Sequence, residues 1–177
     1  MKKIKGILTK TERMKLRAGD EVLYTGTVYT ARDQAHKRLY EAIVKKKKLP
    51  ICLKDVILYY TGPTPSRIKN RVGSCGPTTS SRMDSFTPKI LNKGIAGLIG
   101  KGKRSLDVKK AIRKNKAVYF LTIAGAGAYL SKRIKKAKIV AYRDLGAEAI
   151  HKFEVEDFPL IVGIDTKGRD IYSGRMV

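Results

Sequence analysis

The chain has 177 residues, of which 42% are hydrophobic, which is enough for one domain with a substantial buried core and excludes a wholly disordered protein. No apolar run approaches the roughly 20 residues that span a bilayer, so we expect no membrane partner. Lys and Arg number 39 against 15 Asp and Glu. The net charge of +24 has three possible explanations: the protein binds nucleic acid, it binds a protein with an acidic surface, or it simply has a lysine-rich surface in contact with solvent.

The N-terminus and the cysteines indicate the compartment. Residues 1–6 are basic but no apolar segment follows them, so they do not predict a signal peptide. Cys52 and Cys75 match no zinc-site spacing and no CxxC motif, and two thiols are too few for a four-iron cluster. We therefore expect a cytoplasmic protein in which residues 1–177 form a single domain that holds no metal itself.

Strands and helices alternate from the beginning of the chain. Residues 21–29 are rich in β-branched and aromatic side chains and predict a strand. Thr30, with Asp33 as its capping-box partner, predicts the start of a helix. The lysines at 45–48 are more typical of a solvated last helical turn than of a phosphate-binding patch. The apolar face of this helix comprises Ala35, Leu39, Ala42 and Ile43.

The remaining elements continue the alternation. A loop rich in Pro and Gly is expected at 62–66, and a terminal hairpin that turns at 165–168 is expected to lead into a strand at 169–172. Further strands are expected at 56–60, 95–99, 117–123, 138–142 and 159–164. Further helices are expected to begin near Thr79, Thr87, Ser105 and Gly125. The pattern predicts a mixed α/β domain, in which binding residues gather where strand ends lead into helices.

The stretch at 73–84, which reads GSCGPTTSSRMD, is the strongest candidate site. If a helix begins at Thr79, its first N–H groups, the hydroxyls of Thr78 and Thr79 and the guanidinium of Arg82 lie on one side of one pocket. A guanidinium fits a carboxylate with two parallel hydrogen bonds. The segment therefore predicts a binding site for a small carboxylate substrate.

Two other loops carry weaker signals. Residues 124–128 follow a strand as a dinucleotide-binding loop does, but Leu130 occupies the place of the last glycine, so close helix–strand packing is the simpler explanation. Residues 101–105 lack the Walker spacing. They place Lys101 at a strand end and Ser105 at a helix start, which fits either an ordinary capped turn or a further anion contact.

The histidines and hydroxyls do not form a familiar catalytic set. His36 lies one turn beyond Arg32 and is expected on the surface, and His151 is expected to pair with surrounding acidic residues. No Ser-His-Asp order is legible. Thr78 has no histidine near it in sequence, and a threonine is a poor base unless cations stabilise its alkoxide. Such cations are available, whereas the sequence offers no metal ligands, so part of the site must come from elsewhere.

Several strings occur in the same order in one known family. The most specific are TARDQAH at 30–36 and GSCGPTTSSRMD at 73–84, and shorter ones are AGD, YTGP, IGKG, AYRDLG and EVEDFP. Through them nearly the whole chain resembles the β subunit of the two-subunit class I, iron–sulfur fumarate hydratases. The same domain is the C-terminal part of the single-chain enzymes, and L(+)-tartrate dehydratase β subunits share it.

The resemblance implies a fold, a cofactor and a partner. The fold is a swivelling β/β/α domain, similar to the mobile domain of aconitase. The cofactor is a [4Fe-4S] cluster that cysteines of the α subunit bind, with an open iron that serves as a Lewis acid, and this chain supplies no ligand. The implied assembly is an α2β2 heteromer, in which the β subunit is inactive alone.

The resemblance also implies residue roles. Thr78 matches the threonine proposed to take the C3 proton of malate, and Arg82 matches the arginine that binds a substrate carboxylate. Lys101 matches the lysine of the family's KGxxS element, although the nearby Lys103 leaves open which lysine enters the site. The expected substrate-binding residues are Arg32, Thr79, Arg82, Lys101 and Ser105.

The implied reaction is the reversible hydration of fumarate to (S)-malate, a step of the tricarboxylic acid cycle. Tartrate or another small dicarboxylate is the alternative substrate, and residues of the other subunit could distinguish them. The alternative from another class is a non-catalytic nucleic-acid-binding protein. That alternative lacks an RRM, helix-turn-helix, KH or zinc-finger signature, so we expect no nucleic-acid partner.

Overall fold

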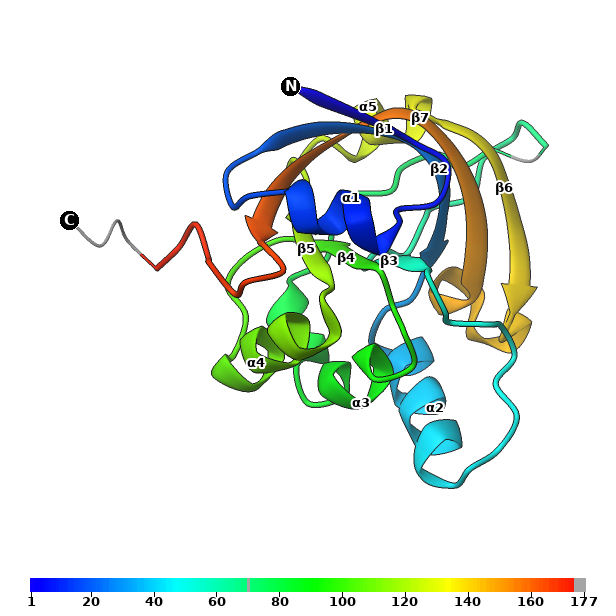
Figure 1. Cartoon of the computed structure of the whole chain (residues 1–177). Coiled ribbons are helices and arrows are strands. Elements are labelled where there is room, and N and C mark those ends of the chain that lie inside the picture. Colours follow the sequence, from blue (N-terminus) through cyan, green and yellow to red (C-terminus); the bar gives the residue numbers. More distant parts are fainter. Residues whose placement is uncertain (70, 174–177) are drawn as a thin grey trace.

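A closed barrel forms the centre of the protein (Figure 1). In the computed structural model, which describes residues 1–69 and 71–173, the strand order is β1-β2-β3-β4-β5-β7-β6, and β2 also pairs with β7. The pairing of β2 with β7 closes five strands into a mixed barrel, parallel from β2 to β5 and antiparallel on both sides of β7. These strands are β2 (Glu21–Thr30), β3 (Ile57–Tyr59), β4 (Gly97–Gly100), β5 (Val118–Leu121) and β7 (Ile150–Ile164).

Two strands extend the barrel, and helices cover part of it. β1 (Lys2–Lys5) runs parallel to the first half of β2, and β6 (Ile134–Ala141) runs antiparallel to the first half of β7. In Figure 1, α2, α3 and α4 lie together on one side of the sheet, below the barrel. The helices are α1 (Lys10–Lys15), α2 (Asp33–Val44), α3 (Thr87–Leu91), α4 (Leu106–Asn115), α5 (Gly127–Lys132) and the 3-10 helices η1 (Ser80–Met83) and η2 (Arg143–Glu148).

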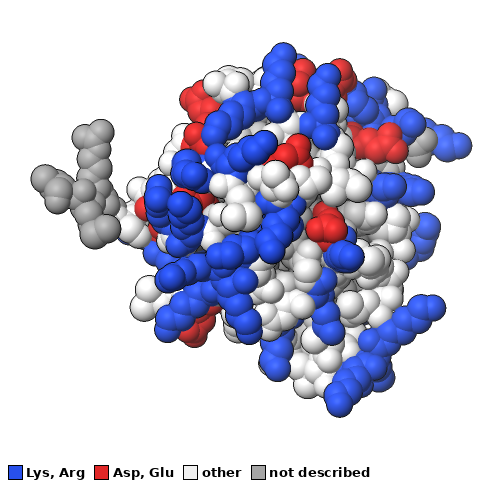
Figure 2. Space-filling model, viewed as in Figure 1, with Lys and Arg blue, Asp and Glu red and all other residues white. Residues whose placement is uncertain are grey.

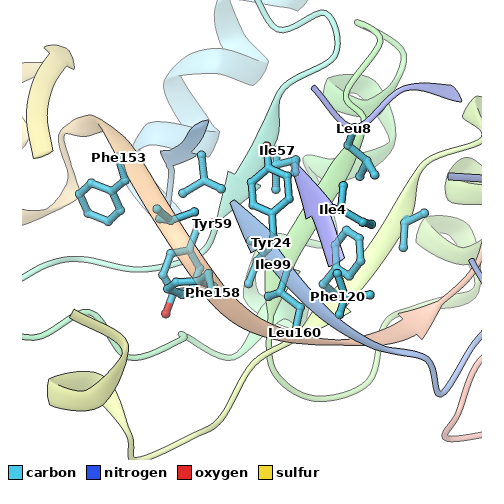
Figure 3. Close-up of a cluster of buried hydrophobic side chains, with 14 of the residues drawn as sticks. Ile4, Leu8, Tyr24, Ile57, Tyr59, Ile99, Phe120, Phe153, Phe158 and Leu160 are labelled. Carbon is cyan, nitrogen blue, oxygen red and sulfur yellow. The ribbon is translucent and has the colours of Figure 1, made fainter. Parts of the chain in front are cut away.

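Two apolar layers use opposite faces of the same strands. Figure 3 shows one cluster inside the barrel, where aromatic side chains from β2, β3, β5 and β7 meet. The second cluster lies between the strands and the helices, so that Phe120 belongs to the first layer and Tyr119 to the second. The short strands β3 and β5 are buried at every position. Because both of their faces pack against apolar layers, their sequences are continuously apolar.

Most expected elements are confirmed, and the class is mixed α/β. The expected strand at 21–29 matches β2. Those at 56–60 and 117–123 contain β3 and β5, and the one at 95–99 overlaps β4. Those at 138–142 and 159–164 overlap β6 and fall in β7. The short helix at Thr87 begins with Pro in its first turn, and Gly94 follows its end with a φ of 88°. Ser105 caps α4 as expected, because its hydroxyl accepts from the N–H of Val108 at 3.3 Å.

The first expected helix start is wrong. Thr30 is the last residue of β2, and α2 begins at Asp33 with Arg32 as its N-cap. The Thr30 hydroxyl instead lies 3.2 Å from the carbonyl of Ala149 and accepts from the N–H of His151 at 2.9 Å. A cross-strand partner in β7 therefore replaces the expected capping box.

The chain terminus also differs from the expectation. A turn forms at 165–168, with the N–H of Gly168 donating to the carbonyl of Asp165 at 2.9 Å. Only one bridge, between Ile164 and Asp170, follows it, so the expected strand at 169–172 does not form. Within 1–69 and 71–173, no helix is long and apolar enough to cross a membrane.

Candidate functional site

The residues singled out by the sequence gather at the carboxyl ends of β2, β3 and β4. Arg32 lies just beyond β2, and Lys101 directly follows β4. The turn that carries Thr78 crosses the ends of β3 and β4. The N–H of Thr78 donates to the carbonyl of Tyr60 at 2.7 Å, and Thr79 forms a parallel bridge with Lys101. The backbone thus brings Thr78, Thr79 and Lys101 to one edge of the barrel.

The hydroxyls of this turn are available, whereas part of its backbone is not. η1 is a 3-10 helix of four residues, and the N–H of Ser80 donates to the carbonyl of Lys101 at 3.0 Å. The expected cradle of free helix-start N–H groups is therefore wrong for Thr78 and Ser80. Across the described residues, neither the Thr78 hydroxyl nor the Thr79 hydroxyl has a hydrogen-bond partner in the protein. In this turn the threonine hydroxyls are therefore available to bind a substrate, whereas the N–H groups of Thr78 and Ser80 are already bonded.

Hydrogen bonds from residues at the end of β3 hold the segment that leads into the Thr78 turn. The Thr61 hydroxyl donates to the carbonyl of Gly76 at 2.8 Å, and the Tyr59 hydroxyl donates to the carbonyl of Cys75. A Cβ at Gly127 would lie 2.9 Å from the Gly76 nitrogen, so α5 approaches the turn more closely than a side chain allows. This approach explains the small residues at 124–128 as close packing, as the sequence favoured.

Two arginines meet at a carboxylate that the sequence analysis had assigned only to a helix cap. Arg82 Nε donates to Asp33 Oδ1 at 2.9 Å, and Arg32 lies 3.4 Å from Asp33 Oδ2 and 3.7 Å from Glu148. Because its Nε is engaged, the guanidinium of Arg82 is oriented while its two Nη groups have no partner among the described residues. Arg82 is 53% exposed, so those Nη groups can reach a ligand. Asp33 therefore brings the two expected carboxylate binders together.

The structure distinguishes the residues of the loop at 101–105. Lys101 is half-buried, and its N–H donates to the Ser80 hydroxyl at 3.1 Å, whereas Lys103 is exposed. Ser105 uses its hydroxyl to cap α4, and its N–H donates to Asp84 Oδ2 at 2.6 Å. The expectation of a capped turn is confirmed, while a substrate contact of Ser105 stays a prediction.

Arg104 links the two loops of the site, and the sequence analysis missed it. Its side chain is 0% exposed and Nε donates to Asp84 Oδ1 at 2.7 Å. Its Nη groups donate to the hydroxyls of Thr87 at 2.9 Å and of Tyr60 at 3.3 Å. The guanidinium also lies over the rings of Tyr60 and Tyr119, 5.2 and 5.0 Å from their centroids. A buried charge with this many partners fixes the segments that supply them.

Tyr119 extends this network to the candidate lysine. Its hydroxyl lies 2.9 Å from both the Ser80 hydroxyl and the carbonyl of Gly102. Burial raises the pKa of Tyr119, so the phenol keeps its proton and can donate. Gly100 has to be glycine here, because a Cβ would lie 2.0 Å from Ser80 Oγ. The turn with Thr78 and the loop with Lys101 are thus held at a fixed separation.

Both histidines lie elsewhere than expected. His36 is 0% exposed, with Nδ1 3.0 Å from the carbonyl of Arg32, its ring edge-on to Tyr60, and Nε2 without a partner in the described part of the chain. Burial lowers the pKa of His36 to about 4, so the ring is neutral at pH 7. His151 is half-buried, and its Nδ1 lies 3.0 Å from the carbonyl of Ala149. Burial lowers the pKa of His151 as well, and the expected salt link is wrong.

We expect the buried, neutral His36 to make the fold sensitive to mild acid. Between pH 6.5 and pH 4 the unfolded chain binds a proton that the folded chain excludes, so stability falls as pH falls. The expected loss from this residue is on the order of 3 kcal/mol. Urea unfolding of the wild type and of His36→Leu, each at about pH 7 and about pH 4.5, measures it.

The comparison uses the change with pH in each protein, so effects shared by both proteins cancel. The wild type should lose more free energy of unfolding on acidification than His36→Leu. His151→Leu is the matched control at the half-buried histidine, and its pH dependence should stay closer to that of the wild type. Equal pH dependence of the wild type and His36→Leu would show that His36 protonates as easily in the fold as outside it.

The chain offers no set of ligands for a metal cluster in its described part. Across residues 1–69 and 71–173, no group of three or more His, Cys, Asp or Glu is arranged to hold a metal ion. Cys52 is exposed and Cys75 buried, and both are free thiols. Burial raises the pKa of Cys75 to about 12, which disfavours the thiolate that iron would need. An iron–sulfur cluster therefore does not fit the residues of this chain alone.

Comparisons with known proteins agree with the motifs. The profile of the family described as Fumarase C-terminus matches residues 3–175. "Fumarate hydratase class I, anaerobic" of Escherichia coli (strain K12) is 42% identical over 151 residues, which cover 84% of this chain and 28% of that protein. "Fumarate hydratase 2" of Leishmania major is 39% identical over 157 residues, which cover 88% of this chain and 28% of that protein.

A second kind of relative matches over nearly its whole length. "L(+)-tartrate dehydratase subunit beta" of Escherichia coli (strain K12) is 32% identical over 179 residues, which cover 98% of this chain and 88% of that protein. By contrast, the chain spans only about 28% of the fumarate hydratases it matches. The similarity thus concerns one part of the fumarate hydratases and almost the whole of the tartrate dehydratase subunit.

Proposed function

Since the chain belongs to the Fumarase C-terminus family, we propose that it is the β subunit of an iron–sulfur hydro-lyase that interconverts fumarate and (S)-malate. The observation that carries the proposal is the turn with Thr78, which is bonded to the end of β3 and bridged to Lys101 at the end of β4. Cationic and hydroxyl groups at one barrel edge suit a small dicarboxylate.

Each site residue has a role in the proposed reaction. Thr78 Oγ, as an alkoxide, takes the C3 proton of malate, and the electron pair left on C3 is delocalised into the adjacent carboxylate as an aci-carboxylate. Arg82, Arg32 and Lys101 stabilise this growing negative charge, and one such donor contributes on the order of 3 kcal/mol. Thr79 and Ser105 complete the contacts to the substrate. The loss of hydroxide from C2 is left to the partner subunit.

The partner in this proposal is a cluster-bearing α subunit, with which the chain forms an α2β2 heteromer in the cytoplasm. Support comes from the greater length of the fumarate hydratase relatives and from the name of the tartrate dehydratase subunit. The cluster, when bound in the α subunit, supplies a Lewis acid for the substrate hydroxyl. We further propose that residues 1–177 act as one domain that swivels over the site, similar to the mobile domain of aconitase.

Tartrate or another dicarboxylate is the second candidate substrate, because the tartrate dehydratase subunit matches over 88% of its own length. Nucleic-acid binding is less favoured. Figure 2 shows Lys and Arg spread over the visible face, with scattered Asp and Glu between them, rather than confined to one groove. Nucleic-acid binding would weaken steeply with salt and would not depend on Thr78.

Turnover by the reconstituted pair tests the proposed function. The purified chain alone should be inactive, and the chain mixed with its α subunit under anaerobic iron–sulfur reconstitution should convert malate to fumarate. Malate, tartrate and methyl-substituted fumarates are compared at equal enzyme concentration, and kcat/KM should be highest for malate. Highest turnover of tartrate would favour the second candidate, and failure to form any complex with the α subunit would contradict the proposal itself.

A further inference from the structure

The helix α2 begins without a cap of its own. Its N-cap residue is Arg32, whose side chain makes no hydrogen bond to the first turn. By contrast, Thr9 and Ser105 cap α1 and α4 with their hydroxyls. A guanidinium has donors and no acceptor, so Arg32 cannot accept from the unpaired N–H groups of the first turn. An acceptor has to come from another part of the chain.

Glu148 of η2 supplies that acceptor. Its Oε2 accepts from the N–H of Gln34, which stands 114 positions earlier in the chain, at 2.8 Å. Its Oε1 lies 3.7 Å from Arg32 Nη2. Both side chains of this ion pair are half-buried, so water screens their attraction only in part. One carboxylate therefore holds both the start of α2 and the site arginine that stands there.

The position of Glu148 is fixed by the strand that follows it. The N–H of His151 donates to the Thr30 hydroxyl at 2.9 Å, and the same hydroxyl lies 3.2 Å from the carbonyl of Ala149. These contacts join the beginning of β7 to the end of β2, two residues before Arg32. The carboxylate is thus attached to the barrel wall, and a rigid support of this kind is what accurate placement of a binding group requires.

Arg32 has one side-chain nitrogen left for a substrate. Its Nε and Nη2 both lie 3.4 Å from Asp33 Oδ2, and Nη2 also faces Glu148. Within the described ranges 1–69 and 71–173, Nη1 has no hydrogen-bond partner. Nη1 lies beside Gly62, where a Cβ would come within 3.0 Å of it. The two carboxylates therefore set the direction in which Nη1 can donate.

From these contacts we infer that Glu148 is a positioning residue for the reaction, an inference that rests on the proposed function. By holding Nη2 of Arg32 and the first turn of α2, Glu148 directs Nη1 toward a carboxylate oxygen of the substrate. Charge alone predicts the opposite effect, because an acidic side chain near a dicarboxylate repels it. Removal of Glu148 should lower KM if only its charge matters, and should raise KM if it positions Arg32.

Glu148→Ala tests the inference in the chain reconstituted with its α subunit, with whichever of malate and tartrate the wild type prefers. The value of kcat/KM should fall about 30-fold and KM should rise, as for a displaced substrate contact. Glu148→Gln keeps an oxygen that can accept from the N–H of Gln34, so it should recover part of the loss. Asp144→Ala is the matched control, because Asp144 also lies in η2 but holds α2 through Arg38, at 3.0 Å, rather than through Arg32. Its kcat/KM should stay within about threefold of the wild-type value.

The effect of Glu148 should depend on Arg32. In an Arg32→Lys background, which lacks the planar fork, Glu148→Ala should change kcat/KM by less than about threefold. An equal loss in both backgrounds would show that Glu148 acts by another route and would overturn the inference. A lower KM for Glu148→Ala, or the same kcat/KM as for Asp144→Ala, would also overturn it and leave the proposed function standing.

Amide hydrogen exchange in the isolated chain supplies a readout without turnover. The N–H of Gln34 should exchange at least about 10-fold faster in Glu148→Ala than in the wild type, and Asp144→Ala should leave it protected. Unchanged exchange at Gln34 in Glu148→Ala would overturn the inference whatever the turnover. If the wild-type pair turns over neither substrate, the proposed function fails, and exchange at Gln34 alone decides whether Glu148 holds the start of α2.

Discussion

Replacing Thr78 by alanine is expected to lower kcat of the reconstituted pair by about 10²–10⁴-fold, the range typical of a group that transfers a proton in the transition state. KM should change little, because the substrate carboxylates are assigned to Arg32, Arg82 and Lys101. The fold should also be unaffected, since the Thr78 hydroxyl has no partner among the described residues and only its N–H anchors the turn. Steady-state kinetics with malate, with the α subunit saturating, measure the effect.

Two further variants show whether the hydroxyl itself matters. Thr78→Ser keeps a hydroxyl and should retain much more activity than Thr78→Ala. Ser81→Ala removes an exposed hydroxyl three residues further along the same segment and should leave kcat within about twofold. If Thr78→Ala kept wild-type kcat, the base would have to be sought in the partner subunit.

Replacing Arg104 by alanine is expected to cost about 3–5 kcal/mol of the free energy of unfolding, because it leaves the carboxylate of Asp84 without its buried partner. Arg82→Ala is the matched comparison. It also breaks an arginine–aspartate pair, with Asp33, but Arg82 is exposed and such pairs contribute about 1 kcal/mol or less. Urea unfolding of the isolated chain compares the two variants directly.

Turnover should identify Arg82 as the arginine that contacts the substrate. Arg82→Ala should fold normally and lose activity, because its Nη groups are assigned to the substrate. Arg104→Lys keeps a charge next to Asp84 but loses the planar fork, and it should lie between the wild type and Arg104→Ala in stability. Equal stability losses for Arg104→Ala and Arg82→Ala would contradict the view that Arg104 holds the two loops together.

Much of the fold could be predicted because burial on both faces leaves a clear mark in the sequence. Apolar runs indicated the positions of β3, β4 and β5, and a stretch rich in β-branched and aromatic residues indicated β2. The first half of β7 was not expected, because Glu154 and Glu156 alternate with Phe153 and Val155 and drew attention as an acidic surface. β1 and α1 were also not expected, although Thr9 and Glu12 form a capping box at the start of α1. The closure of the barrel depends on pairing between distant strands, which local patterns do not contain.

The site residues that belong to a motif at a strand end could be predicted from the sequence. Residues whose burial depends on contacts with distant segments could not. The motifs placed Arg32, Thr78 and Lys101 at one edge, and the structure has them there. An arginine that follows Lys101-Gly102-Lys103 looks solvated in sequence. Its burial depends on Asp84, on Tyr60, which directly follows β3, and on Tyr119 of β5. His36 was misplaced for the same reason, because the ring of Tyr60 that covers it comes from a different segment.

The pairing of β2 with β7 determines when the protein can fold during its synthesis. Tyr24 and Val28 of β2 lie opposite Phe158 and Phe153 of β7, which the ribosome adds only after β3, β4 and β5 have been made. A nascent chain that has already released β2 to β5 still lacks the strand that closes the barrel, so its inward aromatic side chains stay in contact with water. Contacts between residues so far apart in sequence also form slowly. Synthesis of β7 is therefore a precondition for the barrel interior, and chaperones have an extended apolar target until that strand is released.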